Sequence, residues 1–183
     1  MAQVSTTEVL LKDQRKVTLR SPLASDAGPL LQHLRRGFQQ YSRNMNHPAR
    51  YWDTFSVEEE EKILQSFLSA PEKFMLSAFA AEVIVGNLAV FGMAGEFQKH
   101  NCRLGMGIEE SFQGCGLGAQ MLEHALSEAV KLGFKRMELN VRCFNHGAIA
   151  LYEKMGFRRV GLLKNAALID GEFFDEYLYE RDL

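Results

Sequence analysis

The sequence has few cysteines and no pattern that would pair them or bind a metal. Its three cysteines, Cys102, Cys115 and Cys143, are an odd number at scattered spacing, which does not suggest a disulfide framework. The chain has no CxxC pair, and its five histidines fall in no HxxH or HExxH pattern, the spacings from which zinc sites are usually built. We therefore expect a protein without metal in the reducing cytoplasm.

Long apolar runs and a strong net charge are also missing. The start of the chain, "MAQVSTTEVLLKDQRK", suggests neither a signal peptide nor an anchor, and no stretch approaches the roughly 20 apolar residues of a membrane-spanning helix. The net charge is −2 and the pI about 6.2, so neither nucleic acid nor an anionic membrane is expected as a partner. Without repeats or linkers, the 183 residues predict one domain over 1–183.

The apolar spacing predicts an α/β (α+β) chain. Strands are expected at residues 8–12, 16–20, 73–80, 83–93, 102–110, 136–142, 157–163 and 175–183. Helices are expected at about 27–40, after the capping-box pair Ser56 and Glu59, at about 116–132 and at 146–155, whereas 41–55 resembles a loop. This order favours a central mixed, mostly antiparallel twisted sheet of about seven strands flanked by about four helices.

The most informative stretch is "QGCGLG", Gln113–Gly118, which lies between a predicted strand and a predicted helix. A helix N-terminus carries unpaired N–H groups and a partial positive charge, so it can bind phosphate. Glycines remove the side chains that would keep a phosphate away. A plain strand-to-helix turn is the alternative. No Lys-Ser or Lys-Thr follows, and the glycines come late in the chain, so ATP, GTP and NAD are disfavoured.

A second motif lies downstream, and the two together resemble a known family. "QGCGLG" fits Q/R-x-x-G-x-G/A, and "LNVRCFNHGAIALYEKMGFRRVG" fits L-x-V-x-x-x-N-x-x-A-x-x-L-Y-x-K-x-G-F-x-x-x-G. Both are similar to motifs of the GNAT family of N-acetyltransferases, in that family's order and separation. The resemblance covers about residues 103–161. The tail, "IDGEFFDEYLYERDL", is similar to the subgroup related to ribosomal-protein alanine and polyamine acetyltransferases.

The resemblance implies a GNAT-type fold and the direct transfer of an acetyl group from acetyl-coenzyme A to a primary amine. It implies that Gln113, Gly114, Gly116, Gly118 and Ala119 line the pyrophosphate and that Ile108 offers its backbone to the pantetheine. Asn145 would hydrogen-bond the coenzyme, and by its position it is also a helix N-cap. Tyr152 would face the coenzyme sulfur and donate a hydrogen bond to it; an amphipathic core tyrosine is the alternative.

The candidate bases stand at the end of the strand before the glycine loop. Alternation places Glu109 on the same face as Gly105 and Gly107, where a ligand could approach. Glu110 is the second candidate, Asn140 could orient a water instead, and a water chain could carry the proton. Two solvated carboxylates at a strand end are the structural alternative.

The acceptor remains open at this point. In the family the first helices and the C-terminal hairpin shape the acceptor site, and here those regions contain Tyr41, Arg50, Tyr51, Trp52, Asp175 and Tyr177. Such a groove would suit a cationic small amine, such as a polyamine, or a peptide or protein N-terminus. The competing hypotheses are a non-catalytic module that binds acetyl-coenzyme A or coenzyme A, and a purely structural domain. A homodimer is left open.

Overall fold

The computed structural model describes residues 4–44, 47 and 49–183, apart from the side chains of 38–42, 49 and 50. Its eight strands form one sheet in the order β1-β2-β3-β4-β5-β6-β8-β7. The strands are β1 Thr7–Leu10, β2 Lys16–Arg20, β3 Lys73–Ala80, β4 Val83–Gly92, β5 Asn101–Ile108, β6 Arg136–Arg142, β7 Arg158–Ile169 and β8 Glu172–Asp182.

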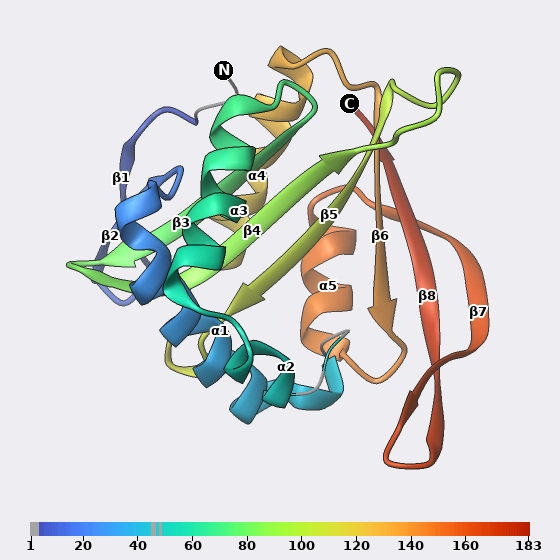
Figure 1. Cartoon of the computed structure of the whole chain (residues 1–183). Helices are drawn as coiled ribbons and strands as arrows, with labels where there is room; N and C mark the ends of the chain where they lie inside the picture. Colours follow the sequence, from blue (N-terminus) through green and yellow to red (C-terminus); the bar gives the residue numbers. More distant parts are fainter. Residues whose placement is uncertain (1–3, 45–46, 48) are drawn as a thin grey trace.

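The middle of the sheet opens between β5 and β6. All neighbouring strands pair antiparallel except these two, which are parallel. Their ladder joins only Asn101–Arg103 to Arg136–Glu138, whereas β4 pairs with β5 along its length, from Cys102 to Ile108. The two strands therefore diverge after Arg103 (Figure 1). The edge of β5 from Leu104 to Ile108 that faces β6 carries no ladder partner in the described chain.

Helices cover both faces of the sheet, and each layer has its own core. On one face lie α1 Ala27–Tyr41 and α3 Val57–Ser69, connected through the short α2 Ala49–Asp53. Their buried cluster includes Leu30, Leu64, Phe67 and Met75. On the other face, α4 Leu117–Lys131 and α5 His146–Lys154 pack in the larger cluster, with Met121 and Tyr152. The cavity described below lies where these two layers meet the gap in the sheet.

Local sequence signals account for most element ends. Ser56 Oγ accepts from Glu59 N–H at 3.2 Å while Glu59 Oε2 accepts from Ser56 N–H at 2.8 Å, so the predicted capping box is formed. Gly133 follows α4 at φ 89°, the left-handed conformation that commonly terminates a helix. Asp170 and Gly171, at φ 51° and 84°, close the β7–β8 hairpin as a two-residue turn with φ > 0 at both positions does.

The mixed, mostly antiparallel fold is confirmed, with three differences from the sequence prediction. The described part of the chain forms five α-helices rather than about four, and its eight strands match the eight segments expected from the sequence, one more than a sheet of about seven. The expected loop at 41–55 contains α2 and a 3₁₀ turn, η2 Ser42–Asn44, because a helix of five residues is too short to show an apolar period. The last two strands are longer than predicted. No helix in the described part of the chain is long and apolar enough to span a membrane.

Candidate active site

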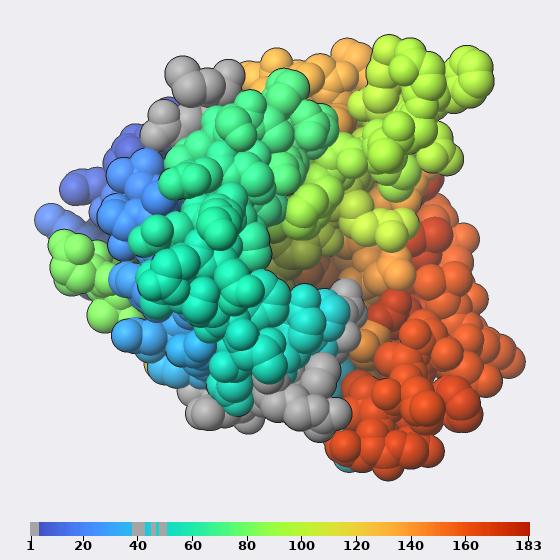
Figure 2. All heavy atoms as spheres, in the orientation of Figure 1, coloured from blue at the N-terminus to red at the C-terminus, as the bar shows by residue number. Residues whose placement is uncertain are grey.

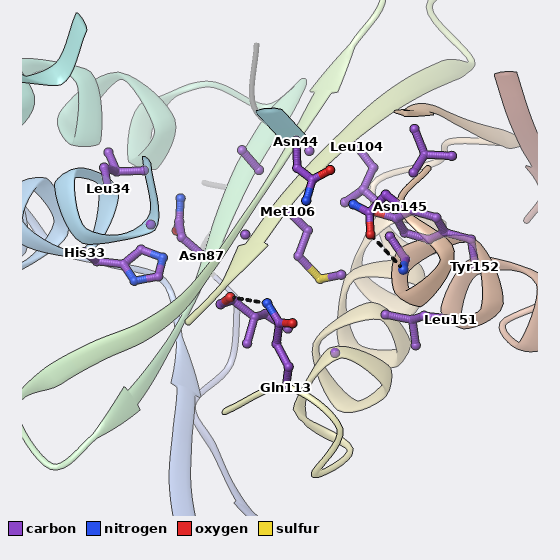
Figure 3. A pocket seen from close by; sticks show the side chains of 18 of the residues that line it. His33, Leu34, Asn44, Asn87, Leu104, Met106, Gln113, Asn145, Leu151 and Tyr152 are labelled. Carbon is purple, nitrogen blue, oxygen red and sulfur yellow. Dashed lines mark hydrogen bonds between the residues drawn. The ribbon is translucent and has the colours of Figure 1, made fainter. Parts of the chain in front are cut away.

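A cavity of about 820 Å³ occupies the gap in the sheet and extends to both helical layers. Figure 2 shows the molecular face hollowed between the atoms of α3 and those of the C-terminal half. In Figure 3, His33 and Leu34 from α1 face Asn145, Leu151 and Tyr152 across this space. The cavity joins the glycine loop, Tyr152 and the α1–α3 layer in one volume, which is large enough for an elongated ligand.

The glycine loop leaves bare backbone at the N-terminus of α4. Gly116 is the N-cap of the helix at φ 95°, with no side-chain hydrogen bond to the cap. Gly114 lies at φ 72°, and a Cβ placed there would meet no described atom within 4 Å. Both glycines line the cavity. Unpaired helix N–H groups with open space before them fit an anionic group such as a pyrophosphate.

Lys12 is a cation beside this loop that sequence reasoning missed. The backbone N–H of Lys12 donates to the Cys115 carbonyl at 3.0 Å. The Cγ and Cε atoms of its side chain lie 3.6 Å from the position that a Cβ on Gly116 would take. The side chain lines the cavity. No local pattern could have found Lys12, because only the tertiary fold brings the β1–β2 turn to the start of α4.

Three other predicted loop residues take different roles. A Cβ on Gly118 would come within 2.8 Å of Leu151 Cδ2 and 3.3 Å of Ile108 Cδ1, so this glycine allows α4 to pack closely against α5 and β5. Gln113 Nε2 donates to the Ile108 carbonyl at 2.9 Å, which braces the loop (Figure 3). Ala119 lines the cavity together with them.

Asn145 and Tyr152 come from the second motif and face the cavity from α5. Asn145 Oδ1 accepts from Ala148 N–H at 3.3 Å, which confirms the N-cap (Figure 3). Tyr152 is buried, with 6% of its surface exposed, and lies edge-on to Phe157. Burial raises the pKa of Tyr152 to about 12. Its phenol therefore stays protonated at neutral pH and can donate a hydrogen bond.

Glu109 is held by two residues of α1. Its Oε1 accepts from Arg36 at 2.8 Å and lies 3.4 Å from His33 Nδ1. The hydrogen bond with His33, followed by the one from Arg36, lowers the pKa of Glu109 against the opposing effect of burial. His33 lines the cavity, whereas Glu109 is not among its lining residues. The predicted base is thus an ionised carboxylate one contact away from the cavity.

The other two candidates for the base are less well placed. Glu110 is exposed in the turn η3 Glu110–Phe112. Asn140 donates from Nδ2 to Glu176 Oε2 at 2.9 Å, and Glu176 also pairs with Arg142. Asn140, Arg142 and Glu176 all line the cavity on the β6–β8 side.

The half of the cavity between the sheet and the α1–α3 layer has a strand floor and two helical walls. Its floor comes from Asn87, Ala89 and Phe91 of β4 and from Arg103, Gly105 and Gly107 of β5; its walls include Leu30, His33 and Leu34 of α1 and Glu60, Ile63 and Phe67 of α3. Every second residue of a strand points to the same face of the sheet. Across the β4–β5 pair, Gly105 lies opposite Ala89 and Gly107 opposite Asn87. A Cβ on Gly105 would meet no described atom within 4 Å, so the glycine opens the groove.

Of the residues that the sequence suggested for the acceptor site, some line the cavity and others do not. Trp52 lines the cavity, but Asp175 and Tyr177 do not, and Glu176 between them does, because successive strand residues point to opposite faces. Tyr51 is exposed, with its ring 5.1 Å from that of Trp52. The side chains of Tyr41 and Arg50 lie outside the described part of the structure.

Comparison with known proteins identifies the family. The family model described as "Acetyltransferase (GNAT) family" matches residues 35–157, more than half of the chain. The chain belongs to the GNAT family of acetyltransferases. The resemblance predicted from the two motifs is therefore confirmed.

Individual GNAT proteins show the same likeness. [Ribosomal protein bS18]-alanine N-acetyltransferase of Escherichia coli strain K12 is 31% identical over 113 residues, which cover 61% of this chain and 66% of that protein, just under two thirds of its length. The crystal structure of an acetyltransferase of the GNAT family from Streptococcus pneumoniae has a TM-score of 0.85 at 27% identity, covering 91% of this chain and 99% of that one. RimL, a ribosomal L7/L12 alpha-N-protein acetyltransferase in complex with coenzyme A, shares the fold with a TM-score of 0.77 at 22% identity, covering 91% and 94%.

These matches agree with the predicted enzyme class and acetyl donor. The family model and all three proteins are acetyltransferases by description. The glycine loop, the divergent strands and Tyr152 lie within or beside the matched region and meet in the one cavity. The family assignment and the geometry thus point to the same site.

Proposed function

We propose that this GNAT protein transfers an acetyl group directly from acetyl-coenzyme A to a primary amine. The observation that carries the proposal is the single cavity, which joins the phosphate-type glycine loop to Tyr152 and continues into a groove under α1 and α3. Acetyl-coenzyme A supplies an already activated thioester. The protein's task is to position the two substrates, accept a proton from the amine and support the leaving sulfur.

The coenzyme would occupy the half of the cavity between α4 and the open edge of β5. In this proposal the backbone at Gly114 and Gly116 meets the pyrophosphate, with the Lys12 ammonium beside it. The backbone of Ile108, at the end of the unpaired β5 edge, binds the pantetheine in the manner of an added strand. Asn145 serves the coenzyme with its remaining hydrogen-bonding groups, since one lone pair of its Oδ1 caps α5.

Tyr152 would donate a hydrogen bond to the sulfur as negative charge develops on it. Its raised pKa of about 12 keeps the proton on the phenol, whereas a simple thiol has a pKa of about 8.5. Full transfer of the proton to a free thiolate is therefore uphill. A hydrogen bond to a charged partner contributes roughly 1.5–3 kcal/mol, which sets the size of the proposed effect.

The proton of the amine would pass to the pair formed by His33 and Glu109. An ionised Glu109 with a lowered pKa is a weak base by itself, but its Oε1 lies 3.4 Å from His33 Nδ1 and orients the imidazole. Imidazole is the usual side-chain base near neutral pH. The demand on this base depends on the acceptor: deprotonation at pH 7 costs about 1 kcal/mol for an α-amine and about 4.6 kcal/mol for a lysine-type amine.

The acceptor classes we propose are a peptide or protein N-terminus and a small amine such as a polyamine. The first is supported by the name of the Escherichia coli relative, which acts on a ribosomal protein alanine. The second is supported by the carboxylate and aromatic side chains of the groove, Glu60 and Trp52. The cytoplasmic location and the homodimer stay predictions.

The test is the release of free thiol from acetyl-coenzyme A across N-terminal peptides, polyamines, amino acids and aminoglycosides. We expect turnover with at least one amine class and an acetylated amine product by mass spectrometry. Coenzyme A binding by calorimetry without thiol release, across all these acceptors, would instead support the non-catalytic module. Failure to bind coenzyme A would contradict both hypotheses.

A further inference from the structure

Glu60 is a buried carboxylate in the wall of the acceptor groove, and its side chain has no ion pair or hydrogen bond with any described residue. It lies in the first turn of α3, has 2% of its surface exposed, and lines the cavity. Its Oε2 is fully buried and has no hydrogen-bond partner among the described residues. A buried charge without a partner is strongly disfavoured, so it calls for a ligand or a functional reason.

Apolar residues share the cavity wall and floor with Glu60. Ile63 and Phe67 lie three and seven residues further along α3, on the same helix face, and Ala89 and Phe91 line the cavity from β4. Burial raises the pKa of Glu60 to about 6, so the carboxylate is still mostly ionised at neutral pH. A negative charge of this kind attracts any cation that enters the groove, because the apolar walls screen it weakly.

The cationic side chains on the neighbouring elements are engaged elsewhere. Arg35 donates to the carbonyls of Trp52 and Phe55, and Arg36 donates to Glu109. Lys73 of β3 donates to Ser66 Oγ. Arg103, on the floor of the cavity, pairs with Glu138 at 3.6 Å. None of these four side chains therefore neutralises Glu60 in the described part of the chain.

Trp52 completes the site with an aromatic surface. It lines the same cavity as Glu60, and its ring centroid lies 5.1 Å from that of Tyr51 and 5.2 Å from that of Phe55. A carboxylate together with an indole binds an ammonium or guanidinium group well, since both attract positive charge.

We propose that Glu60 and Trp52 form a subsite for a second cationic group of the acceptor, an ammonium or guanidinium distinct from the amine that is acetylated. This inference rests on the proposed transferase function. The reacting amine must be neutral to attack the thioester, and a carboxylate in apolar surroundings favours the charged form of an amine. Glu60 belongs to the α3 wall, whereas Ile108 and Tyr152 belong to β5 and α5, so the acceptor spans the groove between them.

The acceptor class is thus an amine with a second positive charge, which either a polyamine or a peptide with a basic residue near its N-terminus provides. The experiment compares matched acceptor pairs: a diamine against a monoamine of equal length ending in a hydroxyl, and an N-terminal peptide with lysine against one with norleucine. Each pair is assayed with the wild type, Glu60→Gln and the neighbouring control Glu61→Gln. The pair in which kcat/KM favours the doubly charged member more strongly shows whether the acceptor is a polyamine or a peptide.

For the wild type we expect kcat/KM to favour the dicationic member of one pair. Glu60→Gln should reduce this preference about 10- to 100-fold, mainly through KM, as expected for the loss of one charge-assisted contact. Glu61→Gln should keep it. Glu60→Met, which suits the apolar wall, serves as a second variant if the glutamine variant does not fold. The inference is overturned if Glu60→Gln retains the preference, or if it lowers kcat equally for both members of each pair, which would indicate a base.

The cation subsite and the transferase function can fail independently, and calorimetry separates the two cases. If the wild type releases no thiol with any acceptor, the transferase function fails, and calorimetry of the same diamine and peptide in the presence of coenzyme A decides the subsite. Weaker binding to Glu60→Gln than to Glu61→Gln supports a cation subsite. Equal binding to both variants contradicts it.

Discussion

Replacing Glu60 by glutamine should change how the stability of the protein depends on pH. The carboxylate is buried and has no partner among the described residues, and burial raises its pKa from the ordinary 4.5 to about 6. At about 1.4 kcal/mol per pH unit, the ionised carboxylate costs the folded state about 2 kcal/mol. Glutamine has nearly the same shape and no charge to bury.

The direction follows from the order of the two pKa values. Below about pH 4.5 the side chain is protonated in both the folded and the unfolded chain, so the charge costs nothing. As pH rises from about 4.5 to about 6, the unfolded chain ionises first and the folded state loses stability. Above about pH 6 the full penalty is present. The stability of Glu60→Gln relative to the wild type should therefore increase by about 2 kcal/mol between pH 4.5 and pH 8.

Denaturant unfolding or thermal melting at several pH values measures this difference. For a chain of this size, about 2 kcal/mol corresponds to roughly 4–8 °C in Tm. Subtracting the two curves cancels any pH-independent cost of burying the amide, and also the contribution of all other ionisable groups, which both proteins retain. Glu61→Gln, next on the helix and less buried, is the matched control, because it also removes a carboxylate from α3. A flat difference for Glu60→Gln would refute the reasoning that its carboxylate is buried without a partner among the described residues.

Four further predictions concern the cavity. Tyr152→Phe should lower kcat about 10- to 100-fold, the loss of one hydrogen bond to a charged group, and leave coenzyme A affinity by calorimetry unchanged; equal turnover would remove its role. Gly116→Val and Gly133→Val place the same side chain at φ 95° and 89° at opposite ends of α4; both should lower Tm by a few degrees, and only the first should abolish coenzyme A binding. Gly105→Leu should raise the KM of the acceptor several-fold at unchanged Tm, because a Cβ there meets open space; an unchanged KM would place the acceptor elsewhere. Lys12→Gln should weaken coenzyme A binding about 5- to 10-fold at low salt and less at high salt, since an exposed charge pair is screened; a loss independent of salt would argue against an ionic contact.

The two motifs made the family and the glycine loop predictable because their information is local. The glycines at 114 and 116 and the N-cap Asn145 act on the backbone immediately around them. Alternation along β5 predicts that Gly105 and Gly107 share a face, a relation that depends only on neighbouring residues, and both glycines line the cavity. The helix spacing of α3 and α4 and the capping box at Ser56 are signals of the same local kind.

The sequence by itself therefore determined the family, the position of the glycine loop and most of the helices and strands, but not the short α2 or the full length of the last two strands. Only the tertiary structure decided which side chains meet: Lys12 beside Gly116, His33 and Arg36 on Glu109, and Glu60 buried in the groove wall. His33 and Glu109 are 76 residues apart in the chain, and their contact depends on the order of strands in the sheet and on the face that α1 covers. Periodicity reports spacings of two to four residues, so contacts of this range become visible only when the sheet and its helices are assembled.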